Sequence, residues 1–380
     1  MICIICEPIT ERNIWLENRY HELCVAVKKR RIEYKVLKSL KEIEELTLNE
    51  PIVVVAIGAH KEWYSYIIKQ CNYANIRVIT FGELFPNSFG GSYSSVTSDL
   101  KGSAMEMLKY LRAYDKLNTI VYGVNPDSEF DVRLADEIEE TFLNDGVTIK
   151  EIIGNGGLKE QIDMFFENCT KCDSVICTND YSAIVLIEAI KERKAELLKK
   201  MFFISFSNTL LSLLYSPSIT TFYEADVGAM HVIRIYRLLV QDLEIGSINF
   251  SIKEHMKIRE TTHFSPHTTG EKGDLSNVSE SYEREEKPDI SLPETITELT
   301  NVESMLANCD KMDINILILL LKDKSSQEIS NILYTSRGSV RYRIKCMVEG
   351  YGFETRSKMI LSLKKFVSPD SLCEYADALL

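Results

Sequence analysis

The chain has 380 residues, 45% of them hydrophobic, and a formal net charge of -12. A chain of this length exceeds one average domain, so we expect at least two folded units, each with its own buried core. The acidic balance excludes a protein that coats nucleic acid or an anionic membrane over its whole surface, because such contacts need positive charge. Any contact of this kind must be local.

Cysteine usage and hydropathy indicate the compartment. Ten cysteines are spread along the chain, and several lie inside apolar runs, as Cys3 and Cys6 do. This usage predicts reduced thiols rather than a disulfide framework. No apolar run approaches the roughly eighteen residues of a membrane-spanning helix, and the opening run is too short for the core of a signal peptide. We therefore expect a cytoplasmic protein that makes no membrane contact.

The first part of the chain, residues 1–264, alternates short apolar runs with helical patterns. This alternation predicts an α/β fold with parallel sheets. The predicted strands are residues 1–6, 32–37, 52–57, 76–81, 119–124, 147–153, 174–178 and 201–206.

The composition changes abruptly at residues 265–293, where Ser, Thr, Gly, Pro and Glu dominate. Such a segment cannot bury enough apolar surface to fold by itself, so it predicts a flexible acidic linker. Helical patterns resume in residues 294–380, which we expect to form a small all-α domain.

Within this tail, residues 325–348 predict two short helices separated by a break at residues 334–336. The serines that can cap them are Ser325 or Ser326 for the first helix and Ser336 for the second. The side chains expected to point inward are Ile329, Leu333, Val340, Ile344 and either Met347 or Val348. The pattern is typical of a helix-turn-helix.

The outward face of the second helix is rich in cations. The candidate DNA-binding residues are Arg337, Ser339, Arg341, Tyr342, Arg343, Lys345 and, further along, Arg356. Arg and Lys contact phosphates and guanine edges in the major groove, so the pattern predicts double-stranded DNA as a partner. Two alternatives stay open: a helical bundle whose cations are only solvated, and a helix-turn-helix that contacts another protein.

This segment resembles the LuxR or GerE type of helix-turn-helix found in bacterial transcription regulators. The matching residues are Glu328, Ile329, Ser330, Ser336, Ser339, Val340, Gly352, Phe353 and Arg356. Asp323 departs from the family's turn Gly, and Arg343 from a common His. The resemblance implies a DNA-binding domain at residues 294–380, and the departures leave the operator sequence open.

The larger part, residues 1–264, resembles the ligand-binding domain of LacI and GalR type repressors, a relative of the type I periplasmic sugar-binding proteins. The motifs that carry the resemblance are "SDLKG", "RLADEIEETFLNDG", "VICTNDYSAI", "FISFSN", "PSITTFYEADVG" and "KIRET". It implies two Rossmann-like lobes with a ligand held in the cleft at the carboxyl ends of their strands. We expect the first lobe at residues 1–115 with a return at 219–241, and the second at 116–218 plus 244–262.

The resemblance also implies ligand-binding residues. Arg133 and Asp180, which follows Asn179, correspond to family positions that reach the cleft, and strand ends add His60, Phe81 and Asn125. Trp15 and Phe222 offer flat faces for a ring. The alternatives are a surface role for Arg133, helix capping for Asp180 and core packing for the aromatic residues. Ser207 replaces the family's Asp, which makes the second-lobe wall less acidic.

Catalytic and metal-binding patterns are weak. Cys3 with Cys6 and Cys169 with Cys172 have the spacing of metal ligands, but they read as core packing. The "GNGG" run at residues 154–157 lacks the order of a phosphate-binding loop. No triad or nucleophile elbow is present. We therefore expect no enzyme, no metal and no cofactor.

Together these patterns predict a cytoplasmic, homodimeric transcription regulator in which a small-molecule effector, a sugar or a related metabolite, modulates DNA binding. The alternatives are a solute-binding or dimerisation protein whose tail contacts another protein, and an enzyme on the same scaffold.

Overall fold

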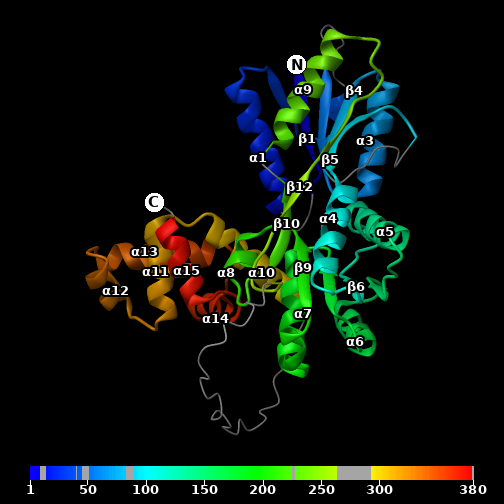
Figure 1. Cartoon of the computed structure of the whole chain (residues 1–380). Helices are drawn as coiled ribbons and strands as arrows, with labels where there is room; N and C mark the ends of the chain where they lie inside the picture. Colours follow the sequence, from blue (N-terminus) through cyan, green and yellow to red (C-terminus); the bar gives the residue numbers. More distant parts are fainter. Residues whose placement is uncertain are drawn as a thin grey trace. The chain divides into compact units, whose positions relative to one another are not determined.

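The computed structural model describes residues 1–8, 14–39, 41–44, 51–82, 90–224, 227–262 and 292–378, without the side chains of 14, 15, 44 and 292–294. The chain forms two compact units (Figure 1). The first consists of Met1–Asn208 and Thr221–Lys257, and the second of Thr209–Thr220 and Ile258–Leu380. Apart from residues 292 and 293, the predicted linker lies outside the described residues. The described helices include none with the length and apolarity to cross a membrane.

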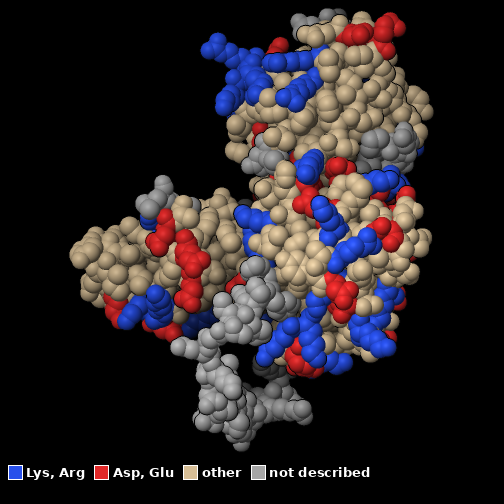
Figure 2. Space-filling model, viewed as in Figure 1, with Lys and Arg blue, Asp and Glu red and all other residues tan. Residues whose placement is uncertain are grey.

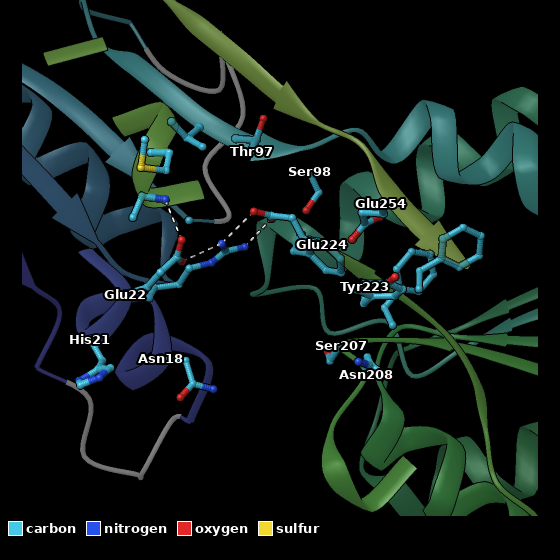
Figure 3. Close-up of a pocket in the computed structure, with 18 of the residues that line it drawn as sticks. Asn18, His21, Glu22, Thr97, Ser98, Ser207, Asn208, Tyr223, Glu224 and Glu254 are labelled. Atoms are coloured by element: carbon cyan, nitrogen blue, oxygen red, sulfur yellow. Dashed lines mark hydrogen bonds and ion pairs between the residues drawn. The ribbon is translucent and has the colours of Figure 1, made fainter. Parts of the chain in front are cut away.

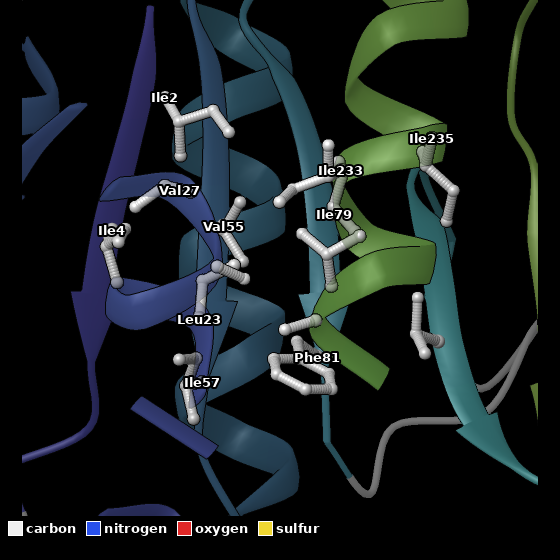
Figure 4. Close-up of a cluster of buried hydrophobic side chains, with 14 of the residues drawn as sticks. Ile2, Ile4, Leu23, Val27, Val55, Ile57, Ile79, Phe81, Ile233 and Ile235 are labelled. Carbon is white, nitrogen blue, oxygen red and sulfur yellow. The ribbon is translucent and has the colours of Figure 1, made fainter. Parts of the chain in front are cut away.

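The first lobe is built on a six-stranded sheet of order β11-β5-β4-β3-β1-β2, and every pairing in it is parallel. Its strands are β1 (Ile2–Cys6), β2 (Tyr34–Leu37), β3 (Val53–Ile57), β4 (Arg77–Phe81), β5 (Ser94–Ser98) and β11 (Asn249–Ile252). Side chains alternate across a strand, so Ile2 and Ile4 pack with α1 (Ile14–Lys29) and α9 (Gly228–Gln241) (Figure 4). Cys3 and Ile5 pack on the other face, with α3 (Lys61–Tyr73); α2 (Lys41–Glu44) adds Ile43 there. Burial on both faces explains the continuous apolar runs.

The second lobe has a six-stranded sheet of order β12-β10-β9-β8-β6-β7. Its strands are β6 (Thr119–Tyr122), β7 (Glu151–Ile153), β8 (Ser174–Cys177), β9 (Phe202–Phe206), β10 (Thr220–Glu224) and β12 (Glu254–Lys257). Strand β12 pairs antiparallel with β10. The helical elements of this lobe are α4 (Leu100–Ala113), α5 (Glu129–Asn144), α6 (Leu158–Asn168), α7 (Asp180–Arg193) and the 3-10 helix η1 (Ala195–Lys199).

The chain crosses between the lobes after β5, after β10 and between β11 and β12. The predicted lobe boundaries were wrong at α4, β10 and β11. Helix α4 was expected in the first lobe, but Leu100 and Met107 pack into the core of the second. Strand β10 lies in the second sheet rather than the first, and β11 in the first rather than the second. Which sheet a strand joins depends on how each crossover packs, and local composition does not encode this.

The second unit is helical, and we call it the helical unit. Its helices are α8 (Leu210–Leu214), α10 (Leu292–Ala307), α11 (Lys311–Leu321), α12 (Ser326–Ile332), α13 (Arg337–Gly350), α14 (Arg356–Phe366) and α15 (Pro369–Ala378). Apolar side chains such as Leu299, Leu317 and Leu363 are fully buried in it. Helix α8 comes from the stretch between β9 and β10, which was expected in the second lobe.

The predicted helix pair is confirmed in α12 and α13. Ser325 caps α12 in a capping box with Glu328, with donor–acceptor distances of 2.9 and 3.2 Å. Ser336 caps α13 by accepting from the amide of Ser339 at 3.0 Å. Between them Tyr334 has a φ of 52°, a left-handed conformation that ends the first helix. The residues buried along the pair are Ile329, Val340, Ile344 and Met347.

Candidate functional site

A cavity of about 1030 Å³ lies between the two lobes. It is walled by α1, by the ends of β5, β8 and β9, by β10, and by the first turn of α5. Its polar lining residues include Asn18, Arg19, His21, Glu22, Thr97, Ser98, Asp131, Thr178, Asn179, Ser207, Asn208, Tyr223, Glu224 and Glu254 (Figure 3). Its volume and its position at the carboxyl ends of parallel strands are those of a small-molecule site.

An ion pair joins the two lobes across this cavity. Arg19 of α1 binds Glu224, the last residue of β10, through two bonds: Nη1 to Oε1 at 2.9 Å and Nη2 to Oε2 at 2.5 Å. The side chains are 14% and 9% exposed. The guanidinium also lies over the Phe81 ring at 4.9 Å. Glu22 accepts from the amide of Ala229 at 2.9 Å, which joins α1 to the start of α9 in the cavity wall. The pair therefore provides an oriented, charged wall for a polar ligand.

Two buried carboxyl groups lie in the same wall. Burial raises the pKa of Glu254 to about 7, and its carboxylate accepts from the Ser103 hydroxyl at 2.7 Å. Burial also raises the pKa of Asp131 to about 6, and that carboxylate accepts from the amide of Asn125 at 3.0 Å. Near neutral pH Glu254 can hold a proton while Asp131 is mostly ionised, so the cavity offers a hydroxyl donor as well as carboxylate acceptors.

The neighbouring residues Asn179 and Asp180 have different roles. Asn179 lines the cavity and caps α7 by accepting from the amide of Ser182 at 2.9 Å. Asp180 is fully buried behind the wall, where it accepts from the hydroxyls of Ser205 (2.5 Å) and Thr221 (2.8 Å). These hydroxyls come from β9 and β10, so Asp180 ties two strands together and Asn179 is the member that a ligand can reach.

The predicted aromatic contacts have different surroundings. Phe222 lines the cavity, but it is fully buried and stacks on Phe206 with ring centroids 5.1 Å apart. Phe81 is buried beneath Arg19 and does not line the cavity. The side chain of Trp15 lies outside the described residues. Both described rings are therefore mainly core residues.

The remaining predicted ligand residues do not meet in this cavity. Arg133 is partly buried on α5 and is not one of the lining residues. His60 is exposed and bonds Glu7 at 2.9 Å from Nδ1 to Oε1. Asn125 is exposed, and its Oδ1 accepts from the amide of Asp127 at 3.0 Å. Sequence reasoning instead missed Arg19, Glu22, Glu224 and Glu254, although a cluster of polar residues on α1 was visible in "ENRYHE".

Cations form a second candidate site on α13. Arg337, Arg341 and Lys345 are exposed, and Ser339 is partly exposed. Arg341, Lys345 and Arg356 surround a hollow of about 310 Å³ together with Ser326, whose hydroxyl oxygen accepts from Arg356 at 3.3 Å. Figure 2 shows acidic side chains over α15, where Asp370, Glu374 and Asp377 are exposed. Exposed cations of the helical unit thus lie on α13 and at the start of α14, and also in the last turn of α14, at Lys364 and Lys365.

Arg343 differs from its neighbours on α13. Its guanidinium donates to Asp310 at 2.9 and 3.0 Å and to Asp313 at 2.8 Å, and only 33% of its side chain is exposed. These bonds raise the pKa of the guanidinium. Both acids belong to the capping box of α11, so Arg343 fastens α13 to α11. The side chain of Arg343, which was predicted to bind DNA, is therefore engaged in bonds within the helical unit.

We expect Arg343→Ala to lower the free energy of unfolding of the helical unit by about 1 kcal/mol, because three charge-assisted bonds at a partly exposed site are lost. Urea unfolding followed by circular dichroism measures the change. Lys345→Ala is the matched control, since the Lys345–Glu349 pair is exposed and its loss should cost less than about 0.5 kcal/mol. Equal losses in the two variants would contradict a fastening role.

The cysteine pairs with metal-ligand spacing do not belong to a larger ligand cluster in the described part of the chain. There, no group of three or more His, Cys, Asp or Glu residues is placed to hold a metal ion. Both pairs with metal-ligand spacing, Cys3 with Cys6 and Cys169 with Cys172, consist of free cysteines.

The sequence matches no protein-family model and no curated protein. Solved structures do match. The complex of the transcriptional regulator CelR with cellobiose has a TM-score of 0.55 at 11% identity, over 68% of this chain and 84% of that one. The chain has the fold of LacI-family regulators. The Lac repressor dimer bound to operator and the anti-inducer ONPF has a TM-score of 0.53 at 12% identity, over 68% of this chain and 93% of that one. A LacI family transcriptional regulator from Silicibacter pomeroyi has a TM-score of 0.53 at 14% identity, over 69% of this chain and 98% of that one.

These likenesses confirm the predicted fold class: an α/β fold with two parallel-sheet lobes like those of LacI-family regulators, to which this chain adds C-terminal helices. At such low identity they concern the fold alone. Function has to be argued from the cavity and from α13.

Proposed function

We propose that the protein is a ligand-responsive, DNA-binding transcription regulator without enzymatic activity. The observation that carries the proposal is the α12–α13 pair: a capped helix-turn-helix whose second helix exposes Arg337, Arg341 and Lys345 on a chain of net charge -12. Such a local concentration of cations on one helix is the electrostatic footprint of a major-groove reader.

The helix-turn-helix is proposed to be of the LuxR type. The capping box of Ser325 and Glu328, the cap at Ser336 and the buried Val340 agree with the residues that carry this resemblance. Asp323, which replaces the turn Gly, has a φ of 57°, the left-handed conformation that favours Gly. Its backbone therefore preserves the turn despite the substitution.

The effector is proposed to be a small polar molecule, a sugar or related metabolite, in the cavity between the lobes. The support is the set of polar groups there, with Arg19, Asn179, Asn208 and Glu254 offering both donors and acceptors. Solved structures with this fold carry cellobiose or ONPF. By the same comparison we propose a cytoplasmic homodimer, in which two helical units read paired half-sites.

A second candidate is a tail that contacts another protein. The observation in its favour is apolar exposure beside the cations: Tyr334 is 97% and Tyr342 69% exposed, and Ile332 is also exposed. Exposed aromatic residues are enriched in protein interfaces. The experiment on DNA binding distinguishes the two candidates.

Genomic fragments should be selected by the full-length protein and sequenced, first with the wild type and then with Arg337→Ala plus Arg341→Ala. We expect an enriched repeat that the double variant binds about thirtyfold more weakly, with a salt slope smaller by about 2, because two phosphate or base contacts are lost. Arg193→Ala plus Lys194→Ala removes the same charge at the end of α7 and should bind like the wild type. If no fragment is enriched at either low or moderate salt, the DNA-binding function is contradicted and contact with another protein becomes the proposed function of the tail.

A further inference from the structure

Helix α8 comes between β9 and β10 in the chain, yet the C-terminal helices hold it at both ends. At its start, the Glu303 carboxylate of α10 accepts from the backbone amides of Leu210 (2.8 Å) and Leu211 (2.7 Å). At its end, the carbonyl of Leu214 accepts from the amide of Ser368, just before α15, at 2.8 Å. These bonds attach a segment of the sensor sequence to the helices that carry α13.

The contacts that attach α8 to the C-terminal helices are buried. Glu303 is only 5% exposed, and a buried carboxylate is costly unless hydrogen bonds satisfy it. The amides at the start of a helix have no partners within the helix, so the carboxylate and the helix start satisfy each other. Leu211 and Leu214 are fully buried. Helix α8 is thus part of the core of the helical unit.

The two residues before Thr209, the N-cap of α8, belong to the cavity wall. Ser207 and Asn208 line the cavity, with φ values of 103° and 49°. Their amides are fixed on β10: Ser207 donates to the carbonyl of Phe222 at 3.1 Å, and Asn208 to the hydroxyl of Thr221 at 3.2 Å. A single residue, Thr209, which is the N-cap of α8, therefore connects the constrained backbone of the cavity wall to α8.

We propose that α8 transmits the state of the cavity to the helical unit: a ligand that contacts Ser207 or Asn208 shifts α8, and Glu303 and Ser368 pass the shift to α10 and α15. This inference rests on the proposed function and names its regulation. It requires no signal through the predicted linker at residues 265–293. Coupling of this kind is reciprocal, so DNA bound to α13 must also affect Ser207 and Asn208.

Hydrogen exchange of the full-length protein, with and without the selected DNA fragment, tests the coupling. We expect DNA to protect α13 and to change exchange across residues 207–214. In Glu303→Gln, α13 should stay protected while the change at 207–214 falls by at least half. Glu298→Gln, at a partly exposed position of the same helix, should behave like the wild type. Protection of α13 without any change at 207–214 in the wild type would overturn the inference and leave the proposed function standing.

A second experiment needs neither DNA nor ligand. A protease site is inserted between Thr262 and Leu292 of the full-length chain, which is then cut. The two fragments should remain together in size-exclusion chromatography at micromolar concentration, and Glu303→Gln should weaken their association at least tenfold. Fragments of the wild type that separate would overturn the inference even if DNA binding failed.

Ser368→Pro provides an independent variant, in case Glu303→Gln does not fold. It deletes the amide that binds the end of α8, and Val367 already has the extended backbone (φ -122°, ψ 123°) that a following proline requires. We expect it to weaken fragment association in the same direction. Association equal to that of the wild type in both variants would show that these bonds do not hold α8.

Discussion

Replacing Phe222 with Ala should lower the free energy of unfolding of the first compact unit by about 3–5 kcal/mol. The ring is fully buried, stacks on Phe206 and belongs to the second-lobe core, so its removal leaves a cavity that the surrounding strands cannot close. Urea unfolding of the full-length protein measures the loss, with near-ultraviolet circular dichroism reporting the aromatic packing.

Phe222→Leu is the control, because it keeps most of the apolar volume and should cost about 1 kcal/mol. The comparison matters for function, since Phe222 also lines the cavity. If the Ala variant lost less than about 1 kcal/mol, the ring would be a mobile side chain available to a ligand rather than a core residue. Ligand binding should then be compared in the Leu variant, which folds in either case.

Glu254→Gln should change how stability depends on pH. The carboxyl has a pKa of about 7 when folded, against an ordinary value of 4.5. Between these values the unfolded chain releases the proton that the folded chain keeps, so the wild type loses stability as pH rises from about 4.5 to 7. The loss approaches about 3 kcal/mol above pH 7. Gln stays neutral and can still accept from the Ser103 hydroxyl, so the variant should escape this loss.

Urea unfolding at a series of pH values between 4 and 8 measures the difference between the two proteins. Glu244→Gln, at an exposed position, is the matched control and should follow the wild type across the range. Parallel curves for wild type and Glu254→Gln would mean that the carboxylate is already ionised in the folded protein, and that the cavity wall carries a full negative charge at this position.

Much of the fold was predictable because its signals are local. Residues 325–348 carry cap residues and an apolar stripe at helical spacing, and α12 and α13 begin where the caps at Ser325 and Ser336 predict. Strands such as β3 and β8 are buried on both faces and therefore read as apolar runs. Strand β5, "SSVTS", was missed because its Ser and Thr residues are buried through hydrogen bonding rather than through apolarity.

The candidate site was predictable only in part. Asn179 and Phe222 line the cavity, while Arg133, His60 and Asn125 do not; ligand binding by any of these residues remains a prediction. The Arg19–Glu224 pair joins residues 205 positions apart, and a helix Arg or a strand-end Glu has no feature that reveals such a partner. The exposed DNA-binding residues remain predictions, as does the division into residues 1–264, 265–293 and 294–380.

The position of α8 limits how such a regulator can be recombined. A gene fusion within residues 263–291 would pass on α10 to α15 without the segment Thr209–Thr220, and the recipient would inherit an unfilled groove where Leu211 and Leu214 are buried. The donor, shortened to its sensor, would expose the same two leucines to solvent. Transfer of helices α10 to α15 from one sensor to another therefore requires a matching exchange of the segment Thr209–Thr220. The C-terminal helices are thus expected to evolve together with the loop that follows β9.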